Sequence, residues 1–588
     1  MTASFLPSTV VTRLALRVLL GAAFLACTPA RAQVVVDGVL GEWDAPLYAD
    51  ATGDGSTLDL GRLWGGSDVE YLYLAFETGA EVGLQNFNSL TLYLDTDDDP
   101  ATGEPVAGIG AEVRYVFGAR SGVATLSGRG LTALAPSDLG FISAPTVTAD
   151  RFEVAVRRGT TVGGAPLFPG SRVRVVLVDG TGGDVLPDEP GGVLLSLRDD
   201  PPVRRPVELA RRAPGDLRVL TYNVLGDGLF REELEPQYRR LLAAIDPDVV
   251  AVQEVYRHDA GAVAARMSAL LPGTEWYGGG VEGSDVAVVA RLPVISTASL
   301  CARPDVPTTC NVAVHLGPGA RAKAGLYVVS MHPPCCTNDI GRQVEFDLLA
   351  AHLRDVRASG ALPPETPVVV AGDMNLVGDR RQVQTLLTGA IVDVDRFGPG
   401  APLDVDGTAL ADAAPPTTGR PADFTWINDG DTYPPGRLDY VVFSDALLEA
   451  RNGFALYTPG LTPEELTHYG LEAGDSAVSD HLPVVQDLAA RVGTSVDGAL
   501  GAGGDLGLPS PNPVRDLATV RYRLDRPGRV RLVLLDALGR VVRVVEDAAR
   551  GAGPHAAVVD VSGLAAGAYV LQLEAGGRVS ARGLAVAR

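Results

Sequence analysis

The stretch LRVLTYNVLGDGLFREELEPQYRRLLAAIDPDVVAVQE, residues 217–254, determines the fold at the centre of this 588-residue chain. An apolar run at 217–222 leads into a helical pattern at 235–244, and a second apolar run follows at 249–253. Two short apolar runs joined by a helix are typical of buried strands in a strand–helix–strand unit. The runs end on Asn223 and Glu254, so the sequence predicts polar side chains at two strand ends.

The same alternation continues to residue 490. Further strand-like runs occupy residues 286–290, 326–330, 368–371 and 438–443, and a helical pattern covers residues 341–356. Short buried strands that alternate with helices predict an α/β sandwich over residues 216–490.

Polar motifs stand at the ends of these runs. In chain order they are TYN (221–223), QE (253–254), a histidine at 332, GDMN (372–375), RLDY (437–440) and SDH (479–481). Metal-assisted phosphoester hydrolysis needs a cation at the phosphate, a base for water and a group that stabilises the leaving oxygen. Together these motifs supply such groups, although each alone is as easily a turn or a strand cap.

The ordered motifs resemble those of the endonuclease/exonuclease/phosphatase (DNase I-like) superfamily, which includes nucleases, sphingomyelinases and inositol polyphosphate phosphatases. The resemblance implies a four-layer α/β sandwich, with two packed sheets flanked by helices and the active site at one open end. It also implies a Mg²⁺ site, with Mn²⁺ as the alternative ion, held by Asn223, Glu254 and Asp480.

By the same resemblance, the catalytic residues are His332, Asp373, Asn375, Asp439 and His481. His481 is the expected general base, oriented by Asp439, and Asp373 is the alternative base. His332 is expected to bind a phosphate oxygen or to protonate the leaving group. If the chain stays extended after residue 371, Asp373 and Asn375 share one face and both point toward the phosphate.

The substrate is less well defined by the sequence. The leading interpretation is an extracellular nuclease that cleaves phosphodiester bonds. The alternatives are a phospholipase C- or sphingomyelinase-like enzyme, a phosphomonoester hydrolase, and a non-enzymatic surface-binding protein on an inactive fold. The net charge of −23 opposes long-range attraction of polyanions but does not exclude a nuclease. Trp276, Tyr277 and the insertion at 399–416 are candidates for the pocket wall.

Residues 33–200 show strand-like runs and almost no helical periodicity, which predicts a β-sandwich. The motif DGVLGEW (37–43), followed by YLYLAF and LYLDTDDD, resembles carbohydrate-binding and DOMON-like modules of secreted bacterial proteins, which implies a glycan ligand. Asp95, Asp97 and Asp99 are candidate Ca²⁺ ligands because they cluster hard oxygens. The alternative is a solvated acidic turn, and Pro100 excludes an EF-hand loop.

The remaining chain contains two linkers and a terminal domain. Residues 201–215 are rich in Pro and Arg, and residues 491–508 are rich in Gly, as expected of linkers. Residues 509–588 alternate like the strands of a small antiparallel, immunoglobulin-like sandwich. Their motifs SPNPV, LLDALGRVV and LAAGAYVLQL resemble the type A C-terminal sorting domain, which implies the type IX secretion machinery as a partner.

Residues 1–32 read as a signal peptide, because Arg13 and Arg17 precede an apolar run and Ala-Arg-Ala stands before Gln33. This predicts a protein that is secreted or held at the outer cell surface. A lipoprotein anchored through Cys27 is the alternative. No later segment is apolar enough to span a bilayer.

Four cysteines remain after the signal peptide, and an even number in an exported protein predicts disulfides. Three pairings are open, and Cys301–Cys310 with Cys335–Cys336 is the favoured one. A zinc site is the alternative, although the spacing typical of zinc ligands is missing.

Overall fold

The computed structural model describes residues 34–586 apart from 52, 127–129, 203, 302–308, 492–504, 508, 510–511, 513, 515–516, 525, 536–539, 566 and 576–577. The chain forms two compact units, Met1–Arg491 and Val492–Arg588. The predicted signal peptide and Cys27 lie outside the described residues. Among the helices that the structure describes, none has the length and apolar character needed to cross a membrane.

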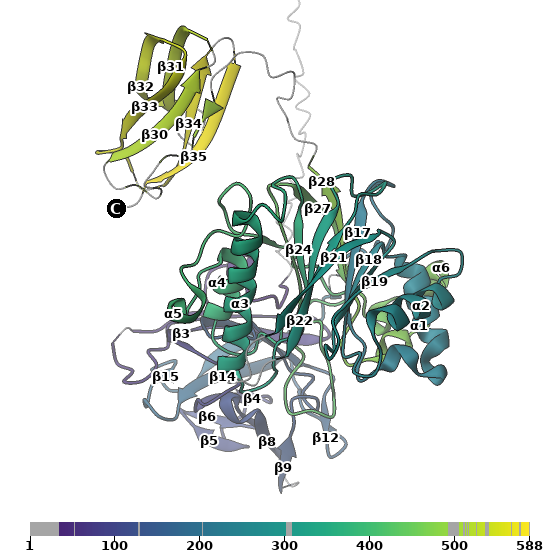
Figure 1. Ribbon diagram of the computed structural model, residues 1–588. Helices are drawn as coiled ribbons and strands as arrows, with labels where there is room; N and C mark the ends of the chain where they lie inside the picture. The colour runs from purple at the N-terminus through teal and green to yellow at the C-terminus, as the bar shows by residue number, and fades with distance from the viewer. Residues whose placement is uncertain are drawn as a thin grey trace, which may run out of the picture. The chain divides into compact units, whose positions relative to one another are not determined.

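The first unit begins with a β-sandwich, shown in purple and blue in Figure 1. One sheet has the order β1 (Tyr48–Ala49), β2 (Arg62–Ser67), β3 (Tyr71–Val82), β11 (Ala149–Arg157) and β10 (Ile142–Ala144). The other has the order β15 (Val185–Leu186), β14 (Arg172–Asp179), β4 (Leu90–Asp95), β7 (Val113–Val116), β8 (Ser121–Leu126) and β9 (Gly130–Leu134), with β16 (Val193–Ser196) also on β14. Side chains such as Phe76, Leu92 and Val175 fill the space between the two sheets.

The central part contains two packed six-stranded sheets. The first has the order β19 (Tyr277–Gly279), β20 (Ala287–Ala290), β18 (Val249–Gln253), β17 (Leu217–Asn223), β28 (Val484–Ala490) and β27 (Leu448–Ala455). The second has the order β21 (Val294–Cys301), β22 (Cys310–Leu316), β23 (Leu326–Met331), β24 (Val368–Asp373), β26 (Asp439–Phe443) and β25 (Ala411–Asp412).

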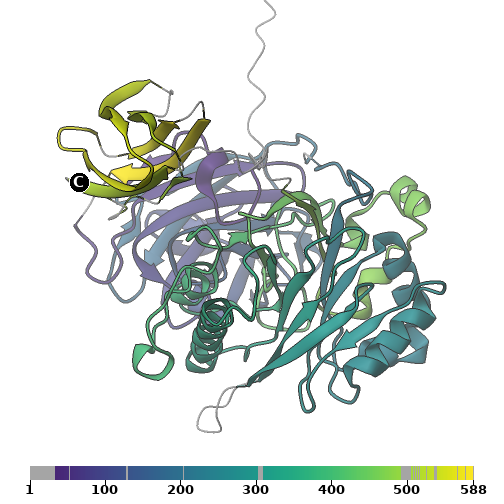
Figure 2. The same cartoon turned by 45° about the horizontal axis from the view of Figure 1, so that its top comes forward.

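Helices cover the outer faces of both sheets (Figures 1 and 2). Helices α1 (Glu235–Ile245) and α2 (Ala260–Leu270) pack on the first sheet, and α3 (Asp339–Ala358) and α4 (Arg381–Thr388) pack on the second. The predicted four-layer α/β sandwich is therefore confirmed.

Strand β17 shows why these strands read as continuous apolar runs. Leu217 and Val219 face the core between the sheets, whereas Leu220 and Tyr222 face the core under α1 and α2. Successive side chains alternate between the faces of a strand, so a strand buried on both faces needs apolar residues throughout.

The N-terminal sandwich and the central sheets share one hydrophobic core. Tyr71, Tyr73 and Ile142 of the sandwich belong to the same buried cluster as Val219 and Phe424. Backbone bonds reinforce this packing, since Val36 N–H donates to Pro421 O (3.0 Å). The sandwich is thus part of the body that carries the central sheets, and its glycan ligand stays a prediction.

The second unit is a small antiparallel sandwich, as predicted. One sheet contains β29 (Asp505–Leu506), β30 (Leu517–Leu524) and β33 (Gly553–Asp560), and the other contains β32 (Val541–Arg550), β31 (Gly528–Leu535), β34 (Gly567–Ala575) and β35 (Arg578–Val586). Strands β33 and β35 were not predicted from the sequence, because Gly, Ala and polar residues interrupt their apolar alternation.

A buried ion pair ties β17 to β28. Arg218 Nε and Nη2 donate to the two carboxylate oxygens of Asp487, at 2.6 and 2.7 Å. Neither side chain is more than 2% exposed. Substitution Asp487→Ala leaves the guanidinium buried without its carboxylate, which should lower the free energy of unfolding by about 3–5 kcal/mol. Urea denaturation measures the change.

The control is Glu449→Gln on β27, which breaks the exposed pair with Arg451. Exposed pairs contribute at most about 1 kcal/mol, so this variant should unfold close to the wild type. Equal urea midpoints for the two variants would contradict the buried pair's role.

Candidate active site

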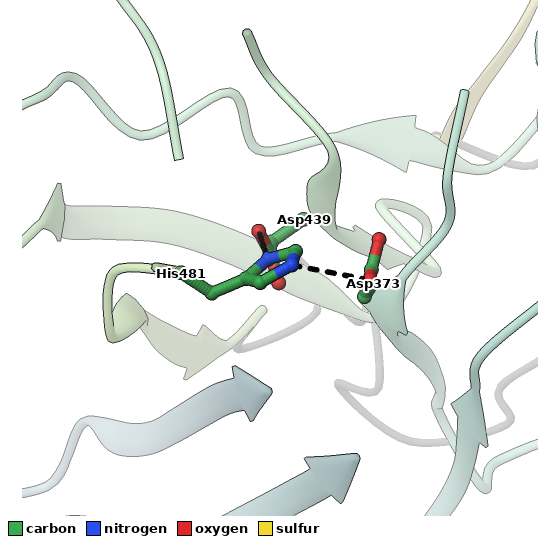
Figure 3. A group of neighbouring side chains, drawn as sticks. All are labelled: Asp373, Asp439 and His481. Atoms are coloured by element: carbon green, nitrogen blue, oxygen red, sulfur yellow. Dashed lines mark hydrogen bonds and ion pairs between the residues drawn. The ribbon is translucent and has the colours of Figure 1, made fainter. Parts of the chain in front are cut away.

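His481 is held by a buried carboxylate. Its Nδ1 lies 2.8 Å from Oδ2 of Asp439, the first residue of β26. A carboxylate only accepts hydrogen bonds, so the proton is on Nδ1 and the ring presents Nε2 to Asp373 Oδ2 at 3.4 Å (Figure 3). The backbone N–H of Asp439 donates to Thr425 Oγ1 (2.9 Å), which fixes the carboxylate at the strand end.

His332 forms a second pair of the same kind. Its Nδ1 lies 2.6 Å from Oδ2 of Asp285, and its Nε2 lies 3.5 Å from Oδ2 of Asp373. Asp285 was not predicted from the sequence. The available signal was its place directly before the run at 286–290, since the other candidate residues also flank strands.

Asp373 is the meeting point of the site. Its Oδ2 accepts hydrogen bonds from Asn223 Nδ2 (3.2 Å) and Asn375 Nδ2 (3.3 Å) and faces both imidazoles. Its Oδ1 accepts from the backbone N–H of Asn375 (3.0 Å). The expectation of an extended chain here was wrong: β24 ends at Asp373, and Asn375 has a left-handed φ of +48°. The turn nevertheless brings both side chains together.

Glu254 also has a left-handed backbone, with φ +63°, directly after β18. Non-glycine residues in this region are strained, and such strain clusters at functional sites. Its Oε2 accepts from Gly226 N–H (2.8 Å) and its Oε1 from Asn223 Nδ2 (3.0 Å). Since Asn223 Oδ1 accepts from Leu225 N–H, the amide NH₂ is directed at the two carboxylates. Asn223 thus joins Glu254 to Asp373.

Asp480 supplies a further carboxylate. Its Oδ2 accepts from Trp426 Nε1 (3.1 Å), whereas its Oδ1 is buried and has no hydrogen-bond partner within the described part of the chain. A buried carboxylate oxygen without a partner fits a cation ligand, and Glu254 and Asp373 add hard oxygens in the same cavity. These residues therefore fit a divalent cation such as Mg²⁺.

Both histidines have raised pKa values in the absence of a cation. Burial lowers the pKa of His481, but the charges of Asp439 and Asp373 outweigh it and raise the pKa to about 10. Burial likewise opposes protonation of His332, but the bond to Asp285 and the charge of Asp373 raise the pKa to about 9. Both rings are therefore cationic at neutral pH and offset part of the negative charge of the carboxylates.

A cavity of about 760 Å³ opens above these side chains. Glu254, Asp373 and His481 all line it, so residues far apart in the sequence converge on one pocket. The expected pocket wall was wrong, because Trp276 is buried in the core under α1 and α2, and neither Tyr277 nor residues 399–416 line the cavity.

All four described cysteines line this cavity. Cys301 is bonded to Cys310, and Cys335 to Cys336, which is the favoured pairing and leaves no thiol for zinc. Arg342 of α3 is fully buried and donates to the carbonyls of Pro334 and Cys336, both at 2.9 Å. The cavity wall formed by residues 333–336 is therefore held by the Cys335–Cys336 disulfide and by the hydrogen bonds of Arg342.

The N-terminal sandwich contributes Gln85 and Thr146 to the cavity wall. Thr146 Oγ1 donates to Leu376 O (2.7 Å), and Thr148 N–H donates to Gly378 O (2.9 Å). Leu376 follows Asn375 directly, and Gly378 lies two residues further along. The sandwich thus braces the segment that carries two of the candidate catalytic residues.

Asn86 follows the cavity residue Gln85 and contacts another one, Tyr433. Asn86 Oδ1 accepts from Tyr433 OH (3.3 Å), and the guanidinium of Arg120 lies 4.1 Å from the centre of the Tyr433 ring. The next residue, Phe87, is 92% exposed and has a φ of +55°. An exposed aromatic ring on a strained backbone is a candidate contact surface for a ligand.

Comparison with known proteins gives two family matches. Residues 220–481 match the Endonuclease/Exonuclease/phosphatase family, and residues 510–586 match the Secretion system C-terminal sorting domain. No curated protein matches the chain.

Several solved structures are similar over about half of the chain. Sphingomyelinase C from Streptomyces griseocarneus has 18% identity over 46% of this chain and 99% of its own, with a TM-score of 0.28. Truncated TDP2 from Caenorhabditis elegans has 15% identity over 47% and 98%, with a TM-score of 0.31. The AP endonuclease LMAP from Leishmania major has 14% identity over 49% and 92%, with a TM-score of 0.29. Similarities this low do not indicate a substrate.

We expect Mg²⁺ binding to release a proton from His481. A cation beside this imidazole disfavours its charged form, whose pKa is about 10 without the cation. Calorimetric titration at about pH 7 should give binding enthalpies that depend on the ionisation enthalpy of the buffer. Affinity should rise with pH, because fewer protons then compete. Binding enthalpies that are the same in every buffer would contradict this prediction.

Proposed function

We propose that residues 220–481, which match the Endonuclease/Exonuclease/phosphatase family, are a cation-dependent phosphodiesterase that cleaves extracellular nucleic acid. The sorting domain at 510–586 supports export through a secretion system. The observation that carries the proposal is the convergence of two histidine–carboxylate pairs on Asp373 Oδ2. A bound divalent cation would neutralise the phosphate oxygens, and Glu254, Asp480 and Asp373 would hold it.

His481 is suited to move the proton of the attacking water. Its Nδ1–H is fixed on Asp439, so only Nε2 is open to the cavity. Once Nε2 is unprotonated it can accept a proton, and the Asp439 carboxylate stabilises the resulting imidazolium. Asp373 lies next to Nε2 and orients the water that gives up the proton.

His332 is suited to the opposite task. Its ring is charged at neutral pH and is held by Asp285, so its Nε2–H can donate to a phosphate oxygen or to the leaving oxygen. Asn375 is fixed at the cavity wall, because its NH₂ donates to the Pro333 carbonyl (2.9 Å) and to Asp373 Oδ2 (3.3 Å). A pre-positioned donor such as His332 Nε2–H stabilises the charge that develops in the transition state.

Aromatic side chains support nucleic acid as the substrate. Tyr256 and Tyr433 line the cavity, and Phe87 is exposed beside Asn86. Every nucleobase offers a flat face that can stack on such rings without sequence preference.

The first test of this function is the substitution His481→Ala. Loss of the proton acceptor should lower kcat on plasmid DNA and on a bis-aryl phosphodiester by about 10²–10⁴-fold, and EDTA should abolish the wild-type activity. The control is His468→Ala, an exposed histidine on α6 (Pro463–Tyr469) that does not line the cavity. A His481→Ala variant as active as the wild type on DNA, RNA, sphingomyelin and sugar phosphates would refute the proposal.

The second test concerns the nucleobase. Substitution Phe87→Ala should raise KM for a short single-stranded oligonucleotide by about tenfold, because one base loses its stacking partner. Since the variant leaves the catalytic residues intact, kcat should change little. Leu131→Ala is the matched control, since Leu131 is an exposed apolar residue on β9 of the same sandwich. An equal KM for both variants would remove the support for nucleic acid without affecting the phosphodiesterase proposal.

A further inference from the structure

A second acidic cluster lies in the N-terminal sandwich and is separate from the active site. Carboxylate oxygens of Asp95, Asp97 and Glu112 lie within 4.8 Å of one another. Asp95 is the last residue of β4, Asp97 lies in the following loop, and Glu112 joins β6 (Ile109–Ala111) to β7. The end of β4, the loop after it and the β6–β7 junction thus bring three negative charges together.

No ion pair compensates these charges among the residues that the structure describes. The two nearby arginines, Arg172 and Arg174, instead bind Asp98, at 2.6 and 2.5 Å. Asp98 is therefore directed away from the cluster by its own partners. Three unpaired carboxylates at such short distances repel one another unless a cation lies between them.

The second observation concerns a single buried atom. Asp95 is 0% exposed, and its Oδ2 has no hydrogen-bond partner within the described part of the chain. Its Oδ1 accepts a long bond from Asp99 N–H (3.3 Å). Burial of a carboxylate oxygen without a donor is costly, and such orphaned atoms are rare in folded proteins. A cation at Oδ2 would remove this cost.

The Thr102 hydroxyl lies among several oxygen atoms of the cluster. Its Oγ1 lies 3.0–3.1 Å from four acceptors, namely both carboxylate oxygens of Asp97, the carbonyl of Asp99 and Oε1 of Glu112. One hydroxyl hydrogen can satisfy only one of them. Glu112 is held in place because its Oε2 accepts from Thr96 N–H (2.8 Å).

We propose that this cluster is a Ca²⁺ site formed by Asp95 Oδ2, Asp97 and Glu112. The donors are hard oxygens, with no nitrogen or sulfur, which suits Ca²⁺ or Mg²⁺ rather than a transition metal. Ca²⁺ is favoured because it accepts the irregular mixture of carboxylate, hydroxyl and carbonyl oxygens found here, whereas Mg²⁺ demands a near-ideal octahedron. The site differs from the sequence prediction in one ligand: the Asp99 carboxylate caps Ala101 N–H (3.0 Å), and Glu112 takes its place.

The test uses the full-length chain, freed of metal with EDTA and then supplied with excess Mg²⁺ to occupy the active site. Calorimetric titration with CaCl₂ should show one Ca²⁺ bound per chain, and Ca²⁺ should raise the melting temperature by several degrees. Glu112→Gln and Asp95→Asn should lose both effects. Absence of a Ca²⁺-dependent change in the wild type, or its persistence in Glu112→Gln, would overturn the proposal.

Asp99→Asn is the matched control, since it changes an acidic residue of the same loop that lies outside the three-carboxylate cluster. It should bind Ca²⁺ like the wild type, and a loss as large as that in Glu112→Gln would overturn the assigned ligand set. Circular dichroism and Mg²⁺-supported phosphodiesterase activity show whether each variant is folded. If Asp95→Asn fails to fold, Glu112→Gln decides the outcome.

Discussion

One carboxylate oxygen, Oδ2 of Asp373, organises the site. Two imidazoles and two side-chain amides surround it, contributed by segments up to about 260 residues apart in the chain. Strand register explains the convergence. Strands β24 and β26 pair Asp373 with Asp439, and the parallel pair of β17 and β18 sets Asn223 beside Gln253, so that Glu254 follows at the same edge. A slip of one residue in either pair would turn these side chains to the opposite face.

Much of this arrangement could be predicted from the sequence, because strands buried on both faces leave a clear apolar signature and the functional residues lie at their ends. The conformation of the chain beyond each strand could not be predicted from the sequence. Glu254 and Asn375 have left-handed backbones that apolar patterns do not encode. Asp285 was missed for a related reason: its importance lies in contact with His332, 47 positions further along, and no local spacing reveals that contact.

The packing of the N-terminal sandwich on the central sheets could not be predicted from the sequence either. Its strands could be recognised, yet the packing of Tyr71 and Tyr73 into the central core depends on two surfaces that fit each other. Because Thr146 and Thr148 bond carbonyls beyond Asn375, the sandwich stabilises the loop after β24 as well as bordering the cavity. The sandwich therefore has a structural role that does not depend on a carbohydrate ligand, and the glycan ligand stays a prediction.

Charge balance links the histidines to the cation. Glu254, Asp285, Asp373 and Asp480 line one cavity, and Asp439 lies behind it on His481 Nδ1. Among the described lining residues, the two imidazoles are the groups that can offset this charge. Protonation of both rings leaves the group negative, so the site favours a divalent cation even when both rings are charged. The cation and the ring protons then compete for the same carboxylates. Under the proposed function, a cation bound at these carboxylates would lower the pKa of His481 and leave its Nε2 free to accept a proton.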